Sequence, residues 1–183
     1  IADLDIVNPY FRTKDSAAVL EKAGVQLVSP QFANSNVDLP ALPAEAYRLV
    51  QDKSIYGIMD IGGDDRGAYA LGRYVPTLKE ENNYRMVFVA NASRPLTRTP
   101  EEALEVMREI EAACGLAFTD IINNTNLADQ TEPEMLYMGH HVAEEAARML
   151  GVSRVVDVAM PQLGVENALP LKRHMAPEWM EEA

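Results

Sequence analysis

The sequence contains very little cysteine: Cys114 is the only one in 183 residues. A single cysteine cannot form an internal disulfide or a cysteine cluster for zinc, and a reducing compartment such as the cytoplasm is the simplest expectation. The chain also lacks a run of about 18 apolar residues, so we expect no membrane-spanning helix. It has no Gly-x-Ser-x-Gly, Cys-x-x-Cys or His-Glu-x-x-His motif. The sequence therefore lacks the motifs that serine hydrolases, dithiol redox proteins and zincins use.

Positive charge is also scarce, because 16 Lys and Arg residues face 28 Asp and Glu residues and give a net charge of −12. Such a field repels the nucleic-acid backbone and anionic lipid, and we expect neither as a partner. With 48% hydrophobic residues, the chain can bury a sizeable core. We predict a single domain over residues 1–183 that ends in an acidic tail at 176–183.

Short apolar runs alternate with longer stretches of helical character. The runs predict strands at 1–7, 25–29, 55–61, 84–91, 118–123, 155–160 and 168–172. Most of these runs are nearly continuous in hydrophobicity, which is typical of parallel strands covered on both faces.

Two of the intervening helices have clear start and stop signals. Thr99-Pro100-Glu101-Glu102 forms a capping box with proline at the first helical position, and Thr131-Glu132-Pro133-Glu134 repeats this logic. Gly115 and Gly151 can end these helices. Shorter helices are expected at 13–23, at 43–51 and after Gly67. Alternation at this interval predicts an α/β fold, with a mostly parallel sheet and helices on both faces.

Polar residues follow the predicted strands, and ligands of open α/β sheets bind outside the carboxyl ends of the strands. Asp60 ends one strand and precedes Gly62 and Gly63. A carboxylate here can hold a divalent cation, and the glycines allow close approach of the backbone to a phosphate. The alternative is that Asp60 caps the next helix and the glycines form a turn.

Two further strand ends carry candidate groups. Asp3 and Asp5 alternate on one strand, so both side chains share a face and resist joint ionisation unless a cation or donor lies between them. They could orient a water or contact a metal-bound phosphate, or they could be a solvated strand end. Asn123-Asn124-Thr125-Asn126 supplies amides that suit a purine edge, or an ordinary polar turn.

His140 and His141 lie four residues before Glu144 and Glu145 on a predicted helix. Each His–Glu pair can meet at this spacing and could ligate a metal, but a solvated helix face is the favoured interpretation. Cys114 lies on an apolar stripe, where a buried core thiol is favoured over a nucleophile.

Three segments, Asp3–Arg12, Asp60–Asp65 and Ile122–Asn126, together resemble the MinD/ParA-type P-loop NTPases, in the class that includes the nitrogenase iron protein. The resemblance implies a P-loop NTPase-like fold that binds Mg²⁺ and ATP. It implies that Asp5 positions the attacking water, that Asp3 lies near the magnesium, and that Asp60 is the Walker B aspartate. It further assigns nucleotide contacts to Gly62, Gly63, Asn123 and Asn124, and switch or partner contacts to Asn8, Arg12 and Arg66.

The sequence departs from this family at the phosphate loop, because no lysine follows a glycine anywhere in the chain. That loop supplies backbone N–H groups, a phosphate-binding lysine and a hydroxyl for magnesium. We expect the strand, loop and helix, roughly 30 residues, to precede Ile1. In the family this strand is central, so a chain without it is expected to have a gap in its core.

The function expected from the resemblance is a partner-directed Mg-ATPase with switch loops, active once the phosphate loop is present. A homodimer, and a protein partner such as a metallo- or redox enzyme, are the expected contacts. Two alternatives stay open: a non-catalytic α/β interaction module without the phosphate loop, and a relative of the ATP-dependent amidotransferases and ligases.

Overall fold

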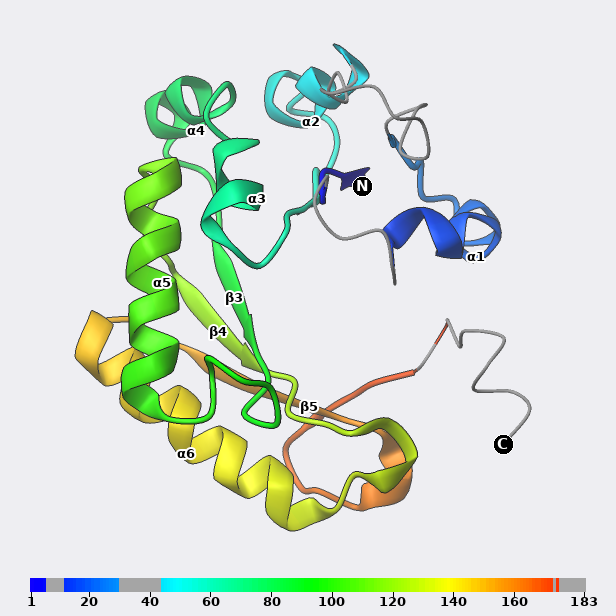
Figure 1. Cartoon of the computed structure of the whole chain (residues 1–183). Coiled ribbons are helices and arrows are strands. Elements are labelled where there is room, and N and C mark those ends of the chain that lie inside the picture. The colour runs from blue at the N-terminus through cyan, green and yellow to red at the C-terminus, as the bar shows by residue number, and fades with distance from the viewer. Residues whose placement is uncertain (6–11, 30–43, 173, 175–183) are drawn as a thin grey trace, which may run out of the picture. The chain divides into compact units, whose positions relative to one another are not determined.

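The computed structural model describes residues 1–5, 12–29, 44–172 and 174. The chain divides into two compact units (Figure 1). Unit 1 contains Ile1–Asn83 and unit 2 contains Tyr84–Lys172. Each unit has parallel strands flanked by helices, so the predicted α/β class is confirmed.

Unit 1 is built on two short parallel strands, β1 (Ala2–Asp3) and β2 (Met59–Asp60). On the other side of β1, Val28 forms an isolated parallel bridge with Ala2. The α-helices of this unit are α1 (Ala17–Lys22), α2 (Arg48–Gln51), α3 (Asp65–Tyr69) and α4 (Val75–Glu81). The 3-10 helices η1 (Thr13–Ser16) and η2 (Ala44–Tyr47) lead directly into α1 and α2.

The core of unit 1 gathers around Tyr74 and Leu4, both fully buried, with Ala2, Ala46 and Val50. The ring of Tyr74 lies against that of Tyr47, with centroids 4.9 Å apart. Ala2 and Leu4 belong to this core and alternate along the chain with the buried Asp3. Packing of these two side chains therefore holds the strand end that carries Asp3 and Asp5.

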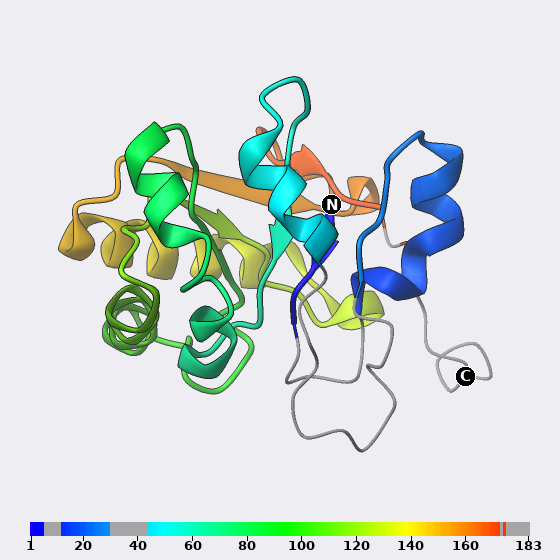
Figure 2. The same cartoon turned by 90° about the horizontal axis from the view of Figure 1, so that it is seen from above.

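Unit 2 has parallel strands in the order β3-β4-β5-β6. Their bounds are β3 (Val87–Ala90), β4 (Asp120–Asn123), β5 (Val155–Ala159) and β6 (Leu169–Pro170). The helices are α5 (Pro100–Cys114), α6 (Pro133–Leu150) and the 3-10 helices η3 (Ala128–Gln130) and η4 (Pro161–Leu163). Helices α5 and α6 pack against each other, and α6 contacts β4 and β5 (Figures 1 and 2).

The two faces of the unit 2 sheet differ in burial. Phe88, Ala90 and Ile121 are buried on one face, as expected under α5 and α6. Val87 and Val89 alternate with them along β3 and are 39% and 58% exposed. The exposed valines are unusual for a parallel strand, which is normally covered on both faces.

The structure corrects two details of the sequence prediction. Within the described residues the parallel strands form two sheets, β1-β2 and β3-β4-β5-β6, rather than one. Helix α5 begins after the capping box of Thr99 and ends at Gly115, as predicted. Helix α6 is capped by Glu132 instead of Thr131, because the Thr131 hydroxyl accepts from the Leu127 N–H and donates to the Ala128 carbonyl.

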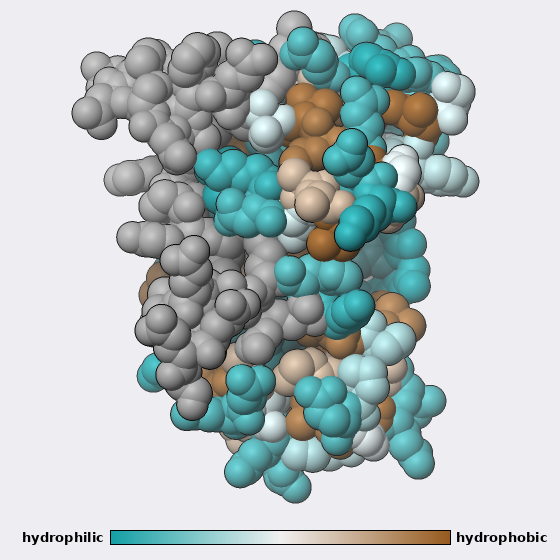
Figure 3. Space-filling view, turned by 90° about the vertical axis from the view of Figure 1, so that its right-hand side faces the viewer, coloured by the Kyte–Doolittle hydropathy of each residue, from teal (hydrophilic) through white to brown (hydrophobic). Residues whose placement is uncertain are grey.

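On the face shown in Figure 3, hydrophobic and hydrophilic residues are interspersed among the described residues. Among the helices of the described residues, none combines the length and the apolar character needed to cross a bilayer.

Candidate functional site

The carboxyl ends of β1 and β2 bring three predicted carboxylates together in unit 1. Asp3 and Asp60 are register partners on neighbouring strands, and the Leu4 N–H donates to the Asp60 carbonyl at 2.8 Å. Asp5 follows β1, and its Oδ1 lies so close to Gly62 that an added Cβ there would be 2.9 Å away. A side chain at position 62 would therefore require the Asp5 carboxylate to shift.

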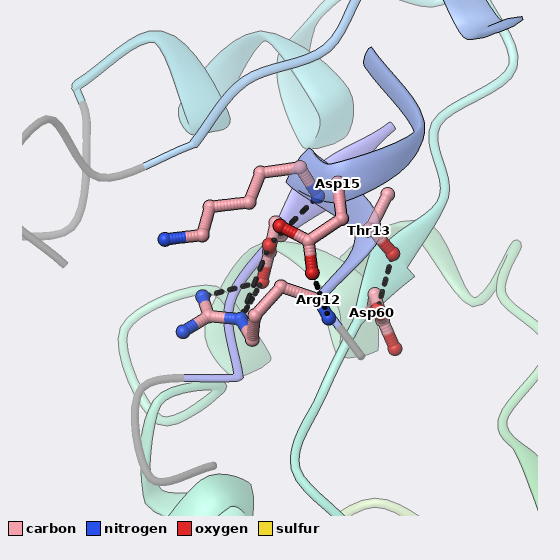
Figure 4. Close-up of polar contacts among 6 residues, drawn as sticks. Arg12, Thr13, Asp15 and Asp60 are labelled. Atoms are coloured by element: carbon pink, nitrogen blue, oxygen red, sulfur yellow. Dashed lines mark hydrogen bonds and ion pairs between the residues drawn. The ribbon is translucent and has the colours of Figure 1, made fainter. Parts of the chain in front are cut away.

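Asp3 is neutralised inside the protein by Arg12. The Arg12 guanidinium donates to Asp3 Oδ1 from Nη2 at 2.6 Å and from Nε at 3.0 Å (Figure 4). The backbone N–H of Lys14 adds a bond to Asp3 Oδ2 at 3.2 Å. Both side chains are buried, so this is a desolvated, charge-assisted pair in which both carboxylate oxygens are used. A direct bond from Asp3 to a metal would require exchange of these donors.

Asp60 has a different environment. Its Oδ2 accepts a hydrogen bond from the Thr13 hydroxyl (Figure 4). Burial raises the pKa of the Asp60 carboxyl, and the negative charges of Asp3 and Asp5 raise it further, against the opposing effects of Thr13 and Arg12. The fold by itself thus disfavours the charged form of Asp60.

The cap of the helix that follows β2 is Asp64, not Asp60. Asp64 Oδ1 accepts from the Gly67 N–H at 2.7 Å at the start of α3. The alternative interpretation of Asp60 as the helix cap is therefore wrong. Gly63 is exposed, and a Cβ there would meet nothing within 4 Å.

In unit 2, Asn123 at the end of β4 is fully buried, and its amide is used within the protein. Nδ2 donates to the Leu136 carbonyl at 3.0 Å and to Asp157 Oδ1 at 2.8 Å. Oδ1 accepts from the backbone N–H and the hydroxyl of Thr125, at 3.2 and 2.7 Å. A contact between Asn123 and a purine would have to displace these partners, whereas Asn124 is partly exposed.

The same network joins the loops that follow β3 and β4. Thr125 Oγ1 accepts from the Ala92 N–H at 3.0 Å, and Asn91 Nδ2 donates to the Asn126 carbonyl at 3.1 Å. Helix α6 approaches closely, since a Cβ on Gly139 would lie 2.1 Å from Thr125 Oγ1. The residues at this strand end are therefore fixed by one another and by α6.

His140 makes a contact that its helix spacing did not indicate. Its Nε2 lies 3.2 Å from Glu144 Oε1, as the i, i+4 spacing predicts, and its Nδ1 lies 2.8 Å from Asp157 Oδ2 on β5. Asp157 thus contacts both His140 and Asn123. Among the described residues, no group of three or more His, Cys, Asp or Glu side chains is arranged to hold a metal ion by itself.

The remaining predicted residues have mixed outcomes. Asn8 and the tail at 176–183 lie outside the described residues, and so does the side chain of Arg66. Arg12 is a buried partner of Asp3. Cys114 is buried, as predicted.

Comparison with known proteins gave no match. No family model fits the chain, and neither a curated protein nor a solved structure matches it. The resemblance to the MinD/ParA-type NTPases therefore stays a prediction.

Proposed function

We propose that this chain is the switch-bearing part of a magnesium-dependent ATPase and that the cation binds at the carboxyl ends of β1 and β2. The observation that carries the proposal is the placement of Asp60 beside Asp3 and Asp5, where its negative charge is disfavoured by burial and by like charges. A carboxylate in such a position gains from a divalent cation, which would offset both effects.

The donor set suits magnesium better than a caged metal. Magnesium is commonly held by one or two carboxylates, while waters and substrate phosphates complete its octahedron. Asp60 would be the carboxylate nearest the cation, and Thr13 holds its second oxygen in place. Asp3 would not contact the cation directly, because it already accepts hydrogen bonds from Arg12. Bound magnesium would neutralise charge on a transferring phosphoryl group.

Asp5 is the best candidate to orient an attacking water. Its carboxylate borders the buried Gly62, whose lack of a side chain allows this close approach of Asp5. Gly63 has open space around its Cα and could place its N–H toward a phosphate. In unit 2, Asn124 is a partly exposed amide, and the buried Asn123 holds the shape of its loop.

The proposal needs a phosphate-binding loop, which these 183 residues do not contain. Among the described strands, β2 pairs with β1 alone and β3 pairs with β4 alone. Within the described residues, β2 therefore has one edge at which a further parallel strand could pair, and so does β3.

The direct test is calorimetric titration of the natural full-length protein with Mg-ATP. We expect a Kd of about 1 mM or tighter, within the range typical of enzyme substrates. Asp60→Asn should weaken Mg-ATP binding at least about tenfold, and Asp5→Asn should lower hydrolysis more than binding. Glu109→Gln, an exposed carboxylate on α5, is the matched control and should leave both unchanged.

Asp60→Asn should also change the melting temperature of the protein. Because the folded-state pKa of Asp60 is raised, its charged form opposes folding above that pKa, and stability falls as the pH rises through it. Without Mg²⁺, Asp60→Asn should therefore melt at a higher temperature than the unsubstituted protein near neutral pH, while Mg²⁺ should stabilise only the latter. Absence of Mg-ATP binding by the full-length protein would instead favour the interaction module.

A further inference from the structure

The outer face of α6 carries large apolar side chains that are mostly exposed in the part of the chain that the structure describes. The buried stripe of this helix is made by Leu136, Gly139, Val142, Ala143, Ala146 and Ala147. On the opposite side, Tyr137 and Met138 are 59% and 66% exposed. We define the α6 outer face as Glu134, Tyr137, Met138, His141 and Glu144, which share one side at helical spacing.

The composition of this face is typical of an interface. Tyrosine and methionine are enriched at the centre of protein interfaces, where a rim of polar residues surrounds them. Methionine adapts its shape to a partner because it is unbranched and flexible. Tyr137 and Met138 are each more than half exposed and follow one another on the same face of α6.

The charge around this face has one sign. No Lys or Arg occurs between Arg108 and Arg148, a stretch that contains the whole of η3 and most of α6. Glu132, Glu134 and Glu144 are exposed in this stretch. Arg148, at the far end of α6, is itself paired with Glu145. A second copy of this face, or a nucleic acid, would meet like charge, which is costly at an interface.

We propose that the α6 outer face is a docking surface for a basic amphipathic segment of a protein partner. The apolar side chains of that segment would cover Tyr137 and Met138, and its Lys or Arg residues would face the carboxylates of Glu134 and Glu144. A helix is the fitting shape, because side chains of two helices interdigitate along their surface ridges. The long-range field would steer such a segment to this surface. The proposal is independent of nucleotide binding.

The test uses the full chain and a synthetic peptide of leucine and lysine with helical amphipathic spacing. Binding is followed by ¹⁵N amide shifts and by calorimetry. We expect shifts along residues 134–148 but not on α5, whose exposed Glu101, Glu105 and Glu109 give it similar charge without large exposed apolar residues. Affinity should fall as salt is raised, since screening weakens the charge attraction.

Matched variants separate the proposed surface from general acidity. Tyr137→Ser/Met138→Ser keeps every charge and should weaken the peptide at least about tenfold. Glu105→Gln/Glu109→Gln removes two charges from α5 and should change affinity less than about twofold. Both substituted pairs are exposed, so far-UV circular dichroism should confirm that the fold is intact.

Three outcomes would overturn the proposal. Shifts spread evenly over α5 and α6 would show general charge attraction. Equal binding of a shuffled peptide of the same composition would remove the need for an apolar contact. A dimer of the free chain in sedimentation that Tyr137→Ser/Met138→Ser dissociates would assign the face to a second copy of the chain.

Discussion

The buried pair of Arg12 and Asp3 gives the sharpest prediction about unit 1. Arg12 is 3% exposed and Asp3 is 0% exposed, so neither charge can be solvated by bulk water. Arg12→Met keeps apolar volume but leaves the Asp3 carboxylate with the Lys14 N–H as its remaining described donor. Removing one partner of a buried pair costs about 3–5 kcal/mol, because the other charge is left uncompensated.

Urea unfolding followed by far-UV circular dichroism measures this loss. With a slope of about 1–3 kcal/mol per molar urea, a loss of 3 kcal/mol lowers the midpoint by roughly 1–3 M. Asp3→Asn should also destabilise, since it leaves Arg12 buried and charged. The double variant Asp3→Asn/Arg12→Met should lose clearly less than the sum of the two, because it contains no unpaired charge.

An exposed ion pair provides the control. Arg148→Met breaks the contact with Glu145, in which Arg148 is 68% exposed and Glu145 34% exposed. Its midpoint should stay within error of the unsubstituted chain. A loss of stability in Arg12→Met as small as in Arg148→Met, or simple additivity in the double variant, would contradict an uncompensated buried charge as the cause.

Two further predictions concern unit 2. Gly139→Ala places a methyl group 2.1 Å from Thr125 Oγ1 and 2.5 Å from Asn123 Oδ1; this overpacking, about 1–3 kcal/mol, outweighs the helix propensity gained and should lower the Tm. Burial opposes ionisation of Asp120, but hydrogen bonds from Arg85 and neighbouring groups lower its pKa overall. Its stabilising contribution is therefore lost as the pH falls below about 4, and the acid-induced drop in Tm should be smaller in Asp120→Asn.

Local signals in the sequence predicted the long helices well. Helix α5 has the expected bounds because Thr99 and Glu102 form a reciprocal cap and Gly115 adopts a left-handed conformation with φ 74°. The strands were predicted longer than they are: of the run at 55–61 only Met59–Asp60 is in β2, and of the described residues 1–5 only Ala2–Asp3 is in β1. Strand length depends on pairing along the neighbouring strand, and hydrophobicity of one segment does not report it.

At the start of α6, the residue predicted to cap the helix makes its hydrogen bonds elsewhere. Thr131 has the residue type and spacing of a cap, yet its hydroxyl bonds with Leu127 and Ala128 in the preceding turn. Glu132 then takes the cap position without a side-chain bond. A threonine hydroxyl can bond to the backbone either in a turn or at a helix cap. The sequence alone therefore could not show which of the two Thr131 would do.

The proximity of the three carboxylates in unit 1 was predictable from the sequence, but their electrostatics were not. Asp3, Asp5 and Asp60 follow apolar runs, and parallel pairing brings such residues to one edge. The sequence treats the three as equivalent carboxylates. In the fold, the guanidinium of Arg12 compensates Asp3, whereas burial and neighbouring charge work against ionised Asp60. Arg12, nine residues from Asp3 in the sequence, causes this difference. Asp60 is therefore the carboxylate whose charged form an added cation would stabilise most.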